Sequence, residues 1–144
     1  MRRIVLDTNV FLDCWVFDDP AARALRGAVE LGQAIAVRSA ATDAELTDVL
    51  ARSRFGLKAA ARDALLAPWR SRAAPIDVDV AAPLDCADPD DQKFLDLAIA
   101  AGASVLFTRD KALLATATRA RAHNLQVVLP DAARSVLLFE DRVP

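Results

Sequence analysis

Two aspartates in the chain directly follow apolar segments that are typical of buried strands. Asp7 follows the segment 3–6, and Asp110 closes the Thr108-Arg109-Asp110 sequence after the segment 104–107. Acids at the carboxyl ends of neighbouring parallel strands converge on one edge of the sheet. Their like charges repel unless a cation lies between them, and hard carboxylate oxygens suit Mg²⁺ or Mn²⁺. The alternative for either aspartate alone is a helix cap.

A third aspartate, Asp91, stands at the start of a predicted helix. It shares a helical face with the apolar residues Phe94 and Leu95, so its carboxyl is expected to point inward. The alternative role at a helix start is to stabilise the helix dipole. Asp90 and Asp88 compete for the same assignment, although Asp88 belongs to the preceding loop.

Glu45 is one of only three glutamates in the chain. It stands among apolar residues on a predicted helix, where a carboxylate could complete the acidic cluster. Its spacing from Thr42 also matches a capping box, in which the glutamate would be solvated. The residues alone leave both interpretations open.

The elements that must position these acids alternate between strands and helices. Apolar runs predict strands at 3–6, 35–37, 104–107 and 125–129, and the alternation of apolar and acidic residues over 75–80 suits a strand or an edge segment. In the first half of the chain, capping residues and helical periodicity predict a helix that is capped by Thr8 or Asn9 and runs through Trp15, a helix over 20–31, a helix that carries Glu45, and a helix over 57–69. In the second half they predict a helix from about Asp91 to Gly102, a separate helix from Asp110 to about Arg121, and a helix over 130–138. This order predicts an α/β fold of three layers, α/β/α, with a central parallel sheet flanked by helices.

Length and composition narrow the class of protein. The chain has 144 residues and a formal net charge of −2, which suits one domain over 1–144 without a global positive field. Charged residues interrupt every apolar run before the roughly 20 residues that a membrane span needs, and no signal-peptide pattern is present. We therefore expect a cytoplasmic protein with no membrane association. Cys14 and Cys86 lack the spacing of a zinc site and are expected to be reduced thiols.

Other hydrolytic chemistries find little support in the chain. The only histidine, His123, falls in a predicted surface turn, neither cysteine has a base partner, and no Gly-rich phosphate loop is present. A phosphatase with an Asp-x-Asp nucleophile is disfavoured because Asn9 takes the place of the second aspartate.

Four segments in order resemble the motifs of PIN domains, and more narrowly those of bacterial PIN-type toxins from toxin-antitoxin pairs. The resemblance covers residues 3 to about 130, and the segments are Ile4-Val5-Leu6-Asp7-Thr8-Asn9-Val10, the helix bearing Glu45, Asp88-Pro89-Asp90-Asp91-Gln92-Lys93-Phe94-Leu95, and Val105-Leu106-Phe107-Thr108-Arg109-Asp110. The resemblance implies a metal-dependent endoribonuclease that uses Mg²⁺ or Mn²⁺. It also implies an antitoxin protein as a partner.

The resemblance further implies a role for each polar residue of these motifs. Asp7 would be the central metal ligand, Glu45 and Asp91 would complete the first site, and Asp110 would bind directly, through water or at a second metal. The residues implied to hold these carboxylates by hydrogen bonds are Thr8, Asn9 and Thr108. Asp88 could serve as an outer ligand, and the choice between Asp90 and Asp91 stays open.

An RNA substrate must approach an acidic centre, so cations are needed at its rim. The best placed in the sequence are Arg38, Arg52, Arg54 and Arg109. Two alternatives remain beside the nuclease: another metal-dependent phosphohydrolase, and a nuclease-inactive module that binds RNA or protein. Apolar residues after Pro20 and near Trp69 could form a homodimer interface, although core packing explains them as well.

Overall fold

Five short strands form one sheet in the computed structural model, which describes residues 2–138. Met1 and residues 139–144 of the predicted domain lie outside the described residues. The strands run in the spatial order β3-β2-β1-β4-β5, and every pair is parallel. They are β1 (Arg3–Leu6), β2 (Ile35–Arg38), β3 (Ala74–Pro75), β4 (Val105–Phe107) and β5 (Gln126–Val128). The strands β1 and β4 are therefore direct neighbours.

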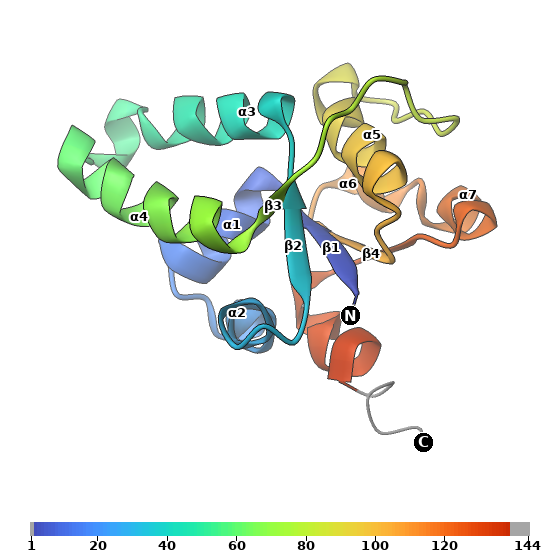
Figure 1. Cartoon of the computed structure of the whole chain (residues 1–144), viewed down its shortest axis with the longest axis horizontal. Helices are drawn as coiled ribbons and strands as arrows, with labels where there is room; N and C mark the ends of the chain where they lie inside the picture. The colour runs from blue at the N-terminus through green and yellow to red at the C-terminus, as the bar shows by residue number, and fades with distance from the viewer. Residues whose placement is uncertain (1, 139–144) are drawn as a thin grey trace.

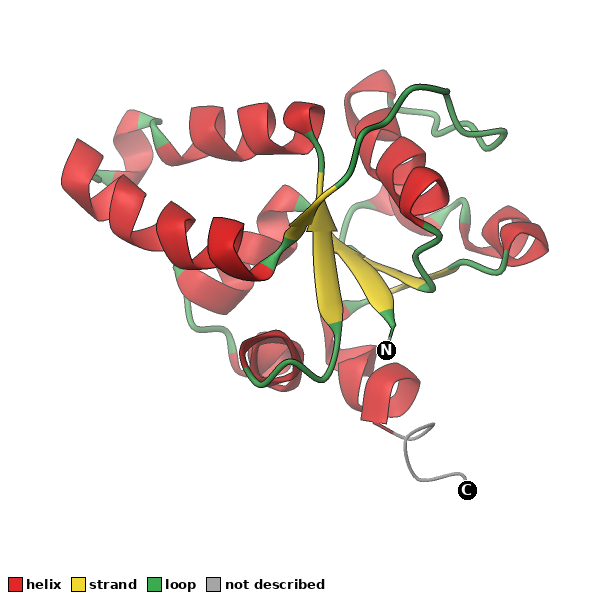
Figure 2. Ribbon diagram, in the orientation of Figure 1, coloured by secondary structure: helices red, strands yellow, loops and turns green. Residues whose placement is uncertain are grey.

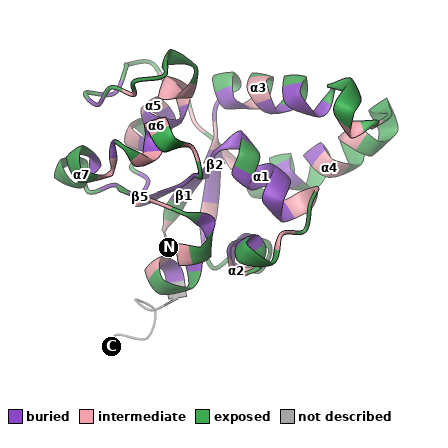
Figure 3. Ribbon diagram, turned by 180° about the vertical axis from the view of Figure 1, so that it is seen from behind, coloured by how far each residue is buried: buried purple, intermediate pink, exposed green. Residues whose placement is uncertain are grey.

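Helices cover both faces of this sheet, as Figures 1 and 2 show. One face is covered by α1 (Thr8–Trp15), α2 (Arg23–Glu30), α3 (Ala40–Leu50) and α4 (Ala59–Arg72), and the other by α5 (Gln92–Ala101), α6 (Lys111–Leu114) and α7 (Ala117–Ala120). Each face has its own buried apolar cluster, and Figure 3 shows the strands buried between the two helical layers. The predicted three-layer α/β/α architecture is confirmed.

The central strand β1 illustrates why the sheet is apolar on both faces. Ile4 and Leu6 belong to the cluster under α1 to α4, whereas Val5 belongs to the cluster under α5 to α7. Successive side chains of a strand point to opposite faces, so a strand covered twice needs an unbroken apolar run. That run stops at Asp7, where the chain leaves the sheet and α1 begins.

The prediction of a strand over residues 75–80 was largely wrong. Pairing with β2 covers only Ala74 and Pro75, and the last bond in this ladder runs from the Ile76 N–H to the Arg38 carbonyl at 2.8 Å. Because β2 ends at Arg38, the segment beyond Ile76 has no strand to pair with, and its alternating aspartates are exposed.

Two predicted helices are also interrupted. The helix expected to continue to Arg121 is divided into α6 and α7, followed by a 3₁₀ turn at Arg121–His123. The expected helix over 130–138 consists of a 3₁₀ turn at Pro130–Ala132 and a π-helical turn at Arg134–Leu138.

Both thiols are free, in line with the sequence analysis. Burial raises the pKa of Cys14 to about 12, which leaves it a poor nucleophile at neutral pH. Within residues 2–138, no helix is both long enough and apolar enough to cross a bilayer.

Candidate metal centre

Asp7 lies at the carboxyl end of β1 and is almost fully buried, with 3% of its surface exposed. One carboxylate oxygen accepts the N–H of Val10 at 2.9 Å, so Asp7 itself caps α1, and the expectation that Thr8 or Asn9 would cap this helix was wrong. The other oxygen accepts the hydroxyl of Thr108. The pKa of Asp7 is raised to about 6, chiefly by burial and in part by the nearby charge of Asp110, although the hydrogen bonds from Thr108 and Val10 lower it.

Thr108 connects Asp7 to Asp110 across the neighbouring strands β1 and β4. Its hydroxyl donates to Asp7 and accepts the backbone N–H of Asp110 at 2.9 Å. Asp110 in turn caps α6, because its Oδ1 accepts the N–H groups of Ala112 at 2.8 Å and Leu113 at 3.2 Å. Each aspartate therefore combines a capping role with a place at the edge of the sheet.

Asp91 enters the same edge from the start of α5. Its Oδ2 atom is buried and, within residues 2–138, has no hydrogen-bond partner. The pKa of Asp91 is raised to about 7, chiefly by burial and next by the charge of Asp110.

The neighbouring aspartates Asp88 and Asp90 are arranged differently. Asp88 caps the turn Pro89–Asp91 by accepting the Asp90 N–H at 3.0 Å, and both side chains are exposed. Of the two residues between which the sequence could not decide, the structure therefore turns Asp91 toward Asp110 and leaves Asp90 in solvent.

Glu45 is held by two groups outside the aspartate cluster. Its Oε2 accepts the hydroxyl of Thr8, and its Oε1 lies 2.8 Å from the ammonium of Lys93 on α5. The alternative of a capping box between Thr42 and Glu45 is wrong, because Thr42 forms that box with Ser39. Sequence reasoning missed Lys93, since its partner is 48 residues away and no periodic pattern links the two.

The three aspartates have the donor chemistry of a site for a hard divalent cation. The charge of Asp110 raises the pKa of both Asp7 and Asp91, and one buried oxygen of Asp91 lacks a partner within the described residues. Within the described residues, no three Asp, Glu, His or Cys side chains form a ready-made metal-binding group. A cation between these carboxylates would neutralise their mutual repulsion. The donor set therefore fits Mg²⁺ or Mn²⁺.

Most of the arginines proposed from the sequence do not offer an unpaired positive charge at this centre. Arg38 pairs with Asp43 at 2.6 Å, and Arg109, although next to Asp110, pairs with the buried Asp13 at 2.8 Å. Arg52 and Arg54 follow the C-terminal end of α3, away from the strand edge where that helix begins. Arg52 makes only a 4.0 Å contact with Asp48, and Arg54 lies 4.8 Å from the ring centroid of Phe55.

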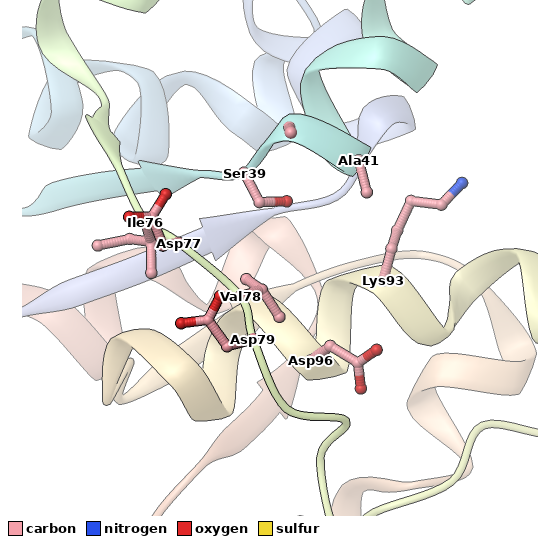
Figure 4. Close-up of a pocket in the computed structure, with 9 residues that line it drawn as sticks. Ser39, Ala41, Ile76, Asp77, Val78, Asp79, Lys93 and Asp96 are labelled. Atoms are coloured by element: carbon pink, nitrogen blue, oxygen red, sulfur yellow. The ribbon is translucent and has the colours of Figure 1, made fainter.

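Two depressions border the region of the centre, one at Asp110 and one at Lys93, the partner of Glu45. One, of about 510 Å³, is lined by Asn9, Asp88, Arg109, Asp110, Lys111 and Ala112. The other, of about 420 Å³, lies between the start of α3 and the loop after β3, and Lys93 borders it together with three aspartates (Figure 4). Asn9 is exposed and borders the first depression, so its amide does not share the buried position of Thr8.

Comparison with known proteins agrees with this fold. The family described as PIN domain matches residues 3–112 of the chain. Among solved structures, the chain is similar to the crystal structure of VapBC2 from Rickettsia felis bound to a DNA fragment from their promoter. The TM-score is 0.60 and the identity 18%, over 87% of this chain and 96% of that chain. A search of curated proteins found no match.

Proposed function

The chain belongs to the PIN-domain family, and on that premise we propose that it is a metal-dependent endoribonuclease that hydrolyses phosphodiester bonds. The observation that carries the proposal is the trio of Asp7, Asp91 and Asp110. Folding forces three carboxyls together at one sheet edge at the cost of raised pKa values and an unpartnered buried oxygen. Such an arrangement is costly for a purely structural role and is suited to a divalent cation.

Each residue of the centre has a distinct part in this proposal. Asp7, held by Thr108 and by the Val10 N–H, would be the most rigid ligand for Mg²⁺ or Mn²⁺. Asp91 offers a free oxygen, and Asp110 would bind directly or through water. Thr8 and Lys93 orient Glu45, which would complete the set.

When bound, the cation would acidify a coordinated water and stabilise the negative charge that develops on the phosphodiester oxygens. The chain's own residues supply the remaining requirements. The hydrogen bonds of Thr108 and Val10 fix the direction of the Asp7 carboxylate, and its burial keeps solvent from competing for it. No histidine is required, because the carboxylates rather than an imidazole would govern proton transfer from the water.

Cleavage of labelled single-stranded RNA tests the proposal. Wild-type protein is assayed with Mg²⁺ or Mn²⁺ and with a chelator, beside Asp7→Asn and the control Asp63→Asn, which changes an exposed aspartate on α4. We expect cleavage that requires the metal, disappears in Asp7→Asn and persists in Asp63→Asn. Metal-dependent cleavage by Asp7→Asn would place the chemistry elsewhere. No binding or cleavage of RNA by folded wild type would favour a protein-binding module.

We also propose that the enzyme is the toxin of a toxin-antitoxin pair. Support comes from the PIN-domain family and from the likeness in fold to the VapBC2 structure, which at 18% identity bears on the fold alone. The test is expression of wild type and Asp7→Asn in bacteria, alone and together with any small protein that is encoded beside the gene. Growth arrest by wild type alone, relieved by the neighbouring product, is expected. Unimpaired growth at high expression of active enzyme would contradict the toxin role.

A further inference from the structure

A substrate phosphate that approaches three aspartates needs a cation that is free to meet it. Two basic residues close to the centre are already engaged. Arg109 lies 2.8 Å from the buried Asp13, and Lys93 lies 2.8 Å from Glu45. Moving either side chain to a phosphate would leave a buried or half-buried carboxylate without its partner, which is costly.

Lys111 is the exception beside the centre. It is the first residue of α6, directly after Asp110, and its side chain is exposed. Within residues 2–138, its ammonium takes part in no ion pair or hydrogen bond with another side chain. An exposed lysine is usually only solvated, so its position relative to the cavities decides whether it can act on a ligand.

That position is the rim of the 510 Å³ depression, where Lys111 stands with Asn9 and Asp110. The volume lies in the range of roughly 300–1,000 Å³ that is typical of small-molecule sites. The 420 Å³ depression is less suited to a phosphate, because its lining holds three aspartates, Asp77, Asp79 and Asp96, against a single lysine (Figure 4). Asp88 also lies on the rim of the 510 Å³ depression and would repel a phosphate. A phosphate would therefore bind on the side of the depression where Lys111 lies.

We propose that this depression receives the nucleotide adjoining the scissile bond of a single-stranded RNA, and that Lys111 contacts its phosphate. The proposal rests on the endoribonuclease function. Lys111 would supply the charge that offsets repulsion by Asp110, and the exposed amide of Asn9 offers a hydrogen bond to the ribose or base. Neither residue need touch the metal, so the RNA affinity and the metal affinity should respond separately to substitution.

The test measures the affinity of labelled single-stranded RNA as a function of salt in the Asp7→Asn background, where RNA stays intact. Three further variants are compared: Lys111→Gln, Lys111→Arg and the control Lys58→Gln, which changes an exposed lysine at the start of α4. Lys111→Gln should weaken binding about tenfold at low salt and reduce the slope of log affinity against log salt by roughly 0.7, the value for one phosphate contact on a single strand. Lys111→Arg should keep most of the affinity, and Lys58→Gln should match its parent.

An unchanged slope and affinity in Lys111→Gln would overturn the proposal. If wild type still cleaved RNA in the presence of metal, only the proposed role of Lys111 would fail. If the parent protein, Asp7→Asn, did not bind RNA at all, both the role of Lys111 and the proposed endoribonuclease function would fail. Mn²⁺ binding to Lys111→Gln in the wild-type background should equal that of wild type. A loss of Mn²⁺ affinity would mean that the lysine acts on the metal centre instead of on RNA.

Discussion

The Lys93 ammonium lies 2.8 Å from Glu45 Oε1, and this ion pair joins α5 to α3. Both side chains are three-quarters buried, with 25% of each exposed. The pair allows a fourth carboxylate to lie near three aspartates without adding an unpaired charge.

A double-mutant cycle should measure this coupling. Lys93→Met and Glu45→Gln are each expected to destabilise the metal-free protein, and the double variant should lose less than the sum, with a coupling of about 1 kcal/mol. Urea unfolding of the four proteins in chelator gives the free energies of unfolding. Strictly additive losses would mean that the contact contributes nothing to stability.

Much of the centre could be predicted because it follows from rules that act along the chain. Asp7 and Asp110 were found from the ends of apolar strands, and β1 and β4 do pair side by side. The inward direction of Asp91 followed from the helical spacing of Phe94 and Leu95, both of which are buried. These features depend on local periodicity, which a sequence displays directly.

The partners of the charged side chains could not be predicted, because they depend on contacts between distant segments. The Arg109–Asp13 pair joins residues 96 positions apart, so Arg109 could be judged only by its adjacency to Asp110. The length of the strand at β3 was overestimated for a similar reason. The alternating residues 76–80 satisfy the local pattern of a strand, but the neighbouring strand β2 ends at Arg38 and offers no partner beyond Ile76.

Removal of the charge of Asp91 should stabilise the metal-free fold. The pKa of Asp91 is about 7 in the folded chain against an ordinary value of 3.8. Between these two pH values the folded state therefore binds more protons than the unfolded state. The contribution of Asp91 to stability is therefore present at low pH and is lost as the pH rises toward 7. Asp91→Asn should raise the Tm in chelator, with a larger gain at pH 8 than at pH 5.

The gain in Tm should be a few degrees, because the Tm of a domain of this size changes by about 2–4 °C for each kcal/mol of stability. Thermal unfolding of wild type and variant at both pH values provides the measurement. The exposed Asp90→Asn serves as the control, since its carboxyl faces solvent. A Tm that falls in Asp91→Asn at pH 8 would show that the carboxylate is stabilising there.

Arg109 is expected to matter for stability through the buried Asp13. In Arg109→Ala the Asp13 carboxylate, with only 4% of its side chain exposed, would lose its charged hydrogen-bond partner. We expect a loss of roughly 2 kcal/mol in the free energy of unfolding, as for other hydrogen bonds to charged groups. The substitution Asp13→Asn in the Arg109→Ala background should recover part of that loss. Denaturant unfolding would refute the assignment if Arg109→Ala were as stable as wild type.

Under the proposed function, Asp7, Asp91 and Asp110 together hold a divalent cation. Calorimetric titration of Mn²⁺ into wild type, Asp91→Asn and Asp90→Asn at pH 7.5 tests it without relying on catalysis. We predict binding by wild type and by Asp90→Asn with equal affinity, and affinity at least about tenfold weaker in Asp91→Asn. Equal Mn²⁺ affinity in wild type and Asp91→Asn, or a loss of affinity confined to Asp90→Asn, would contradict a cation site that includes Asp91.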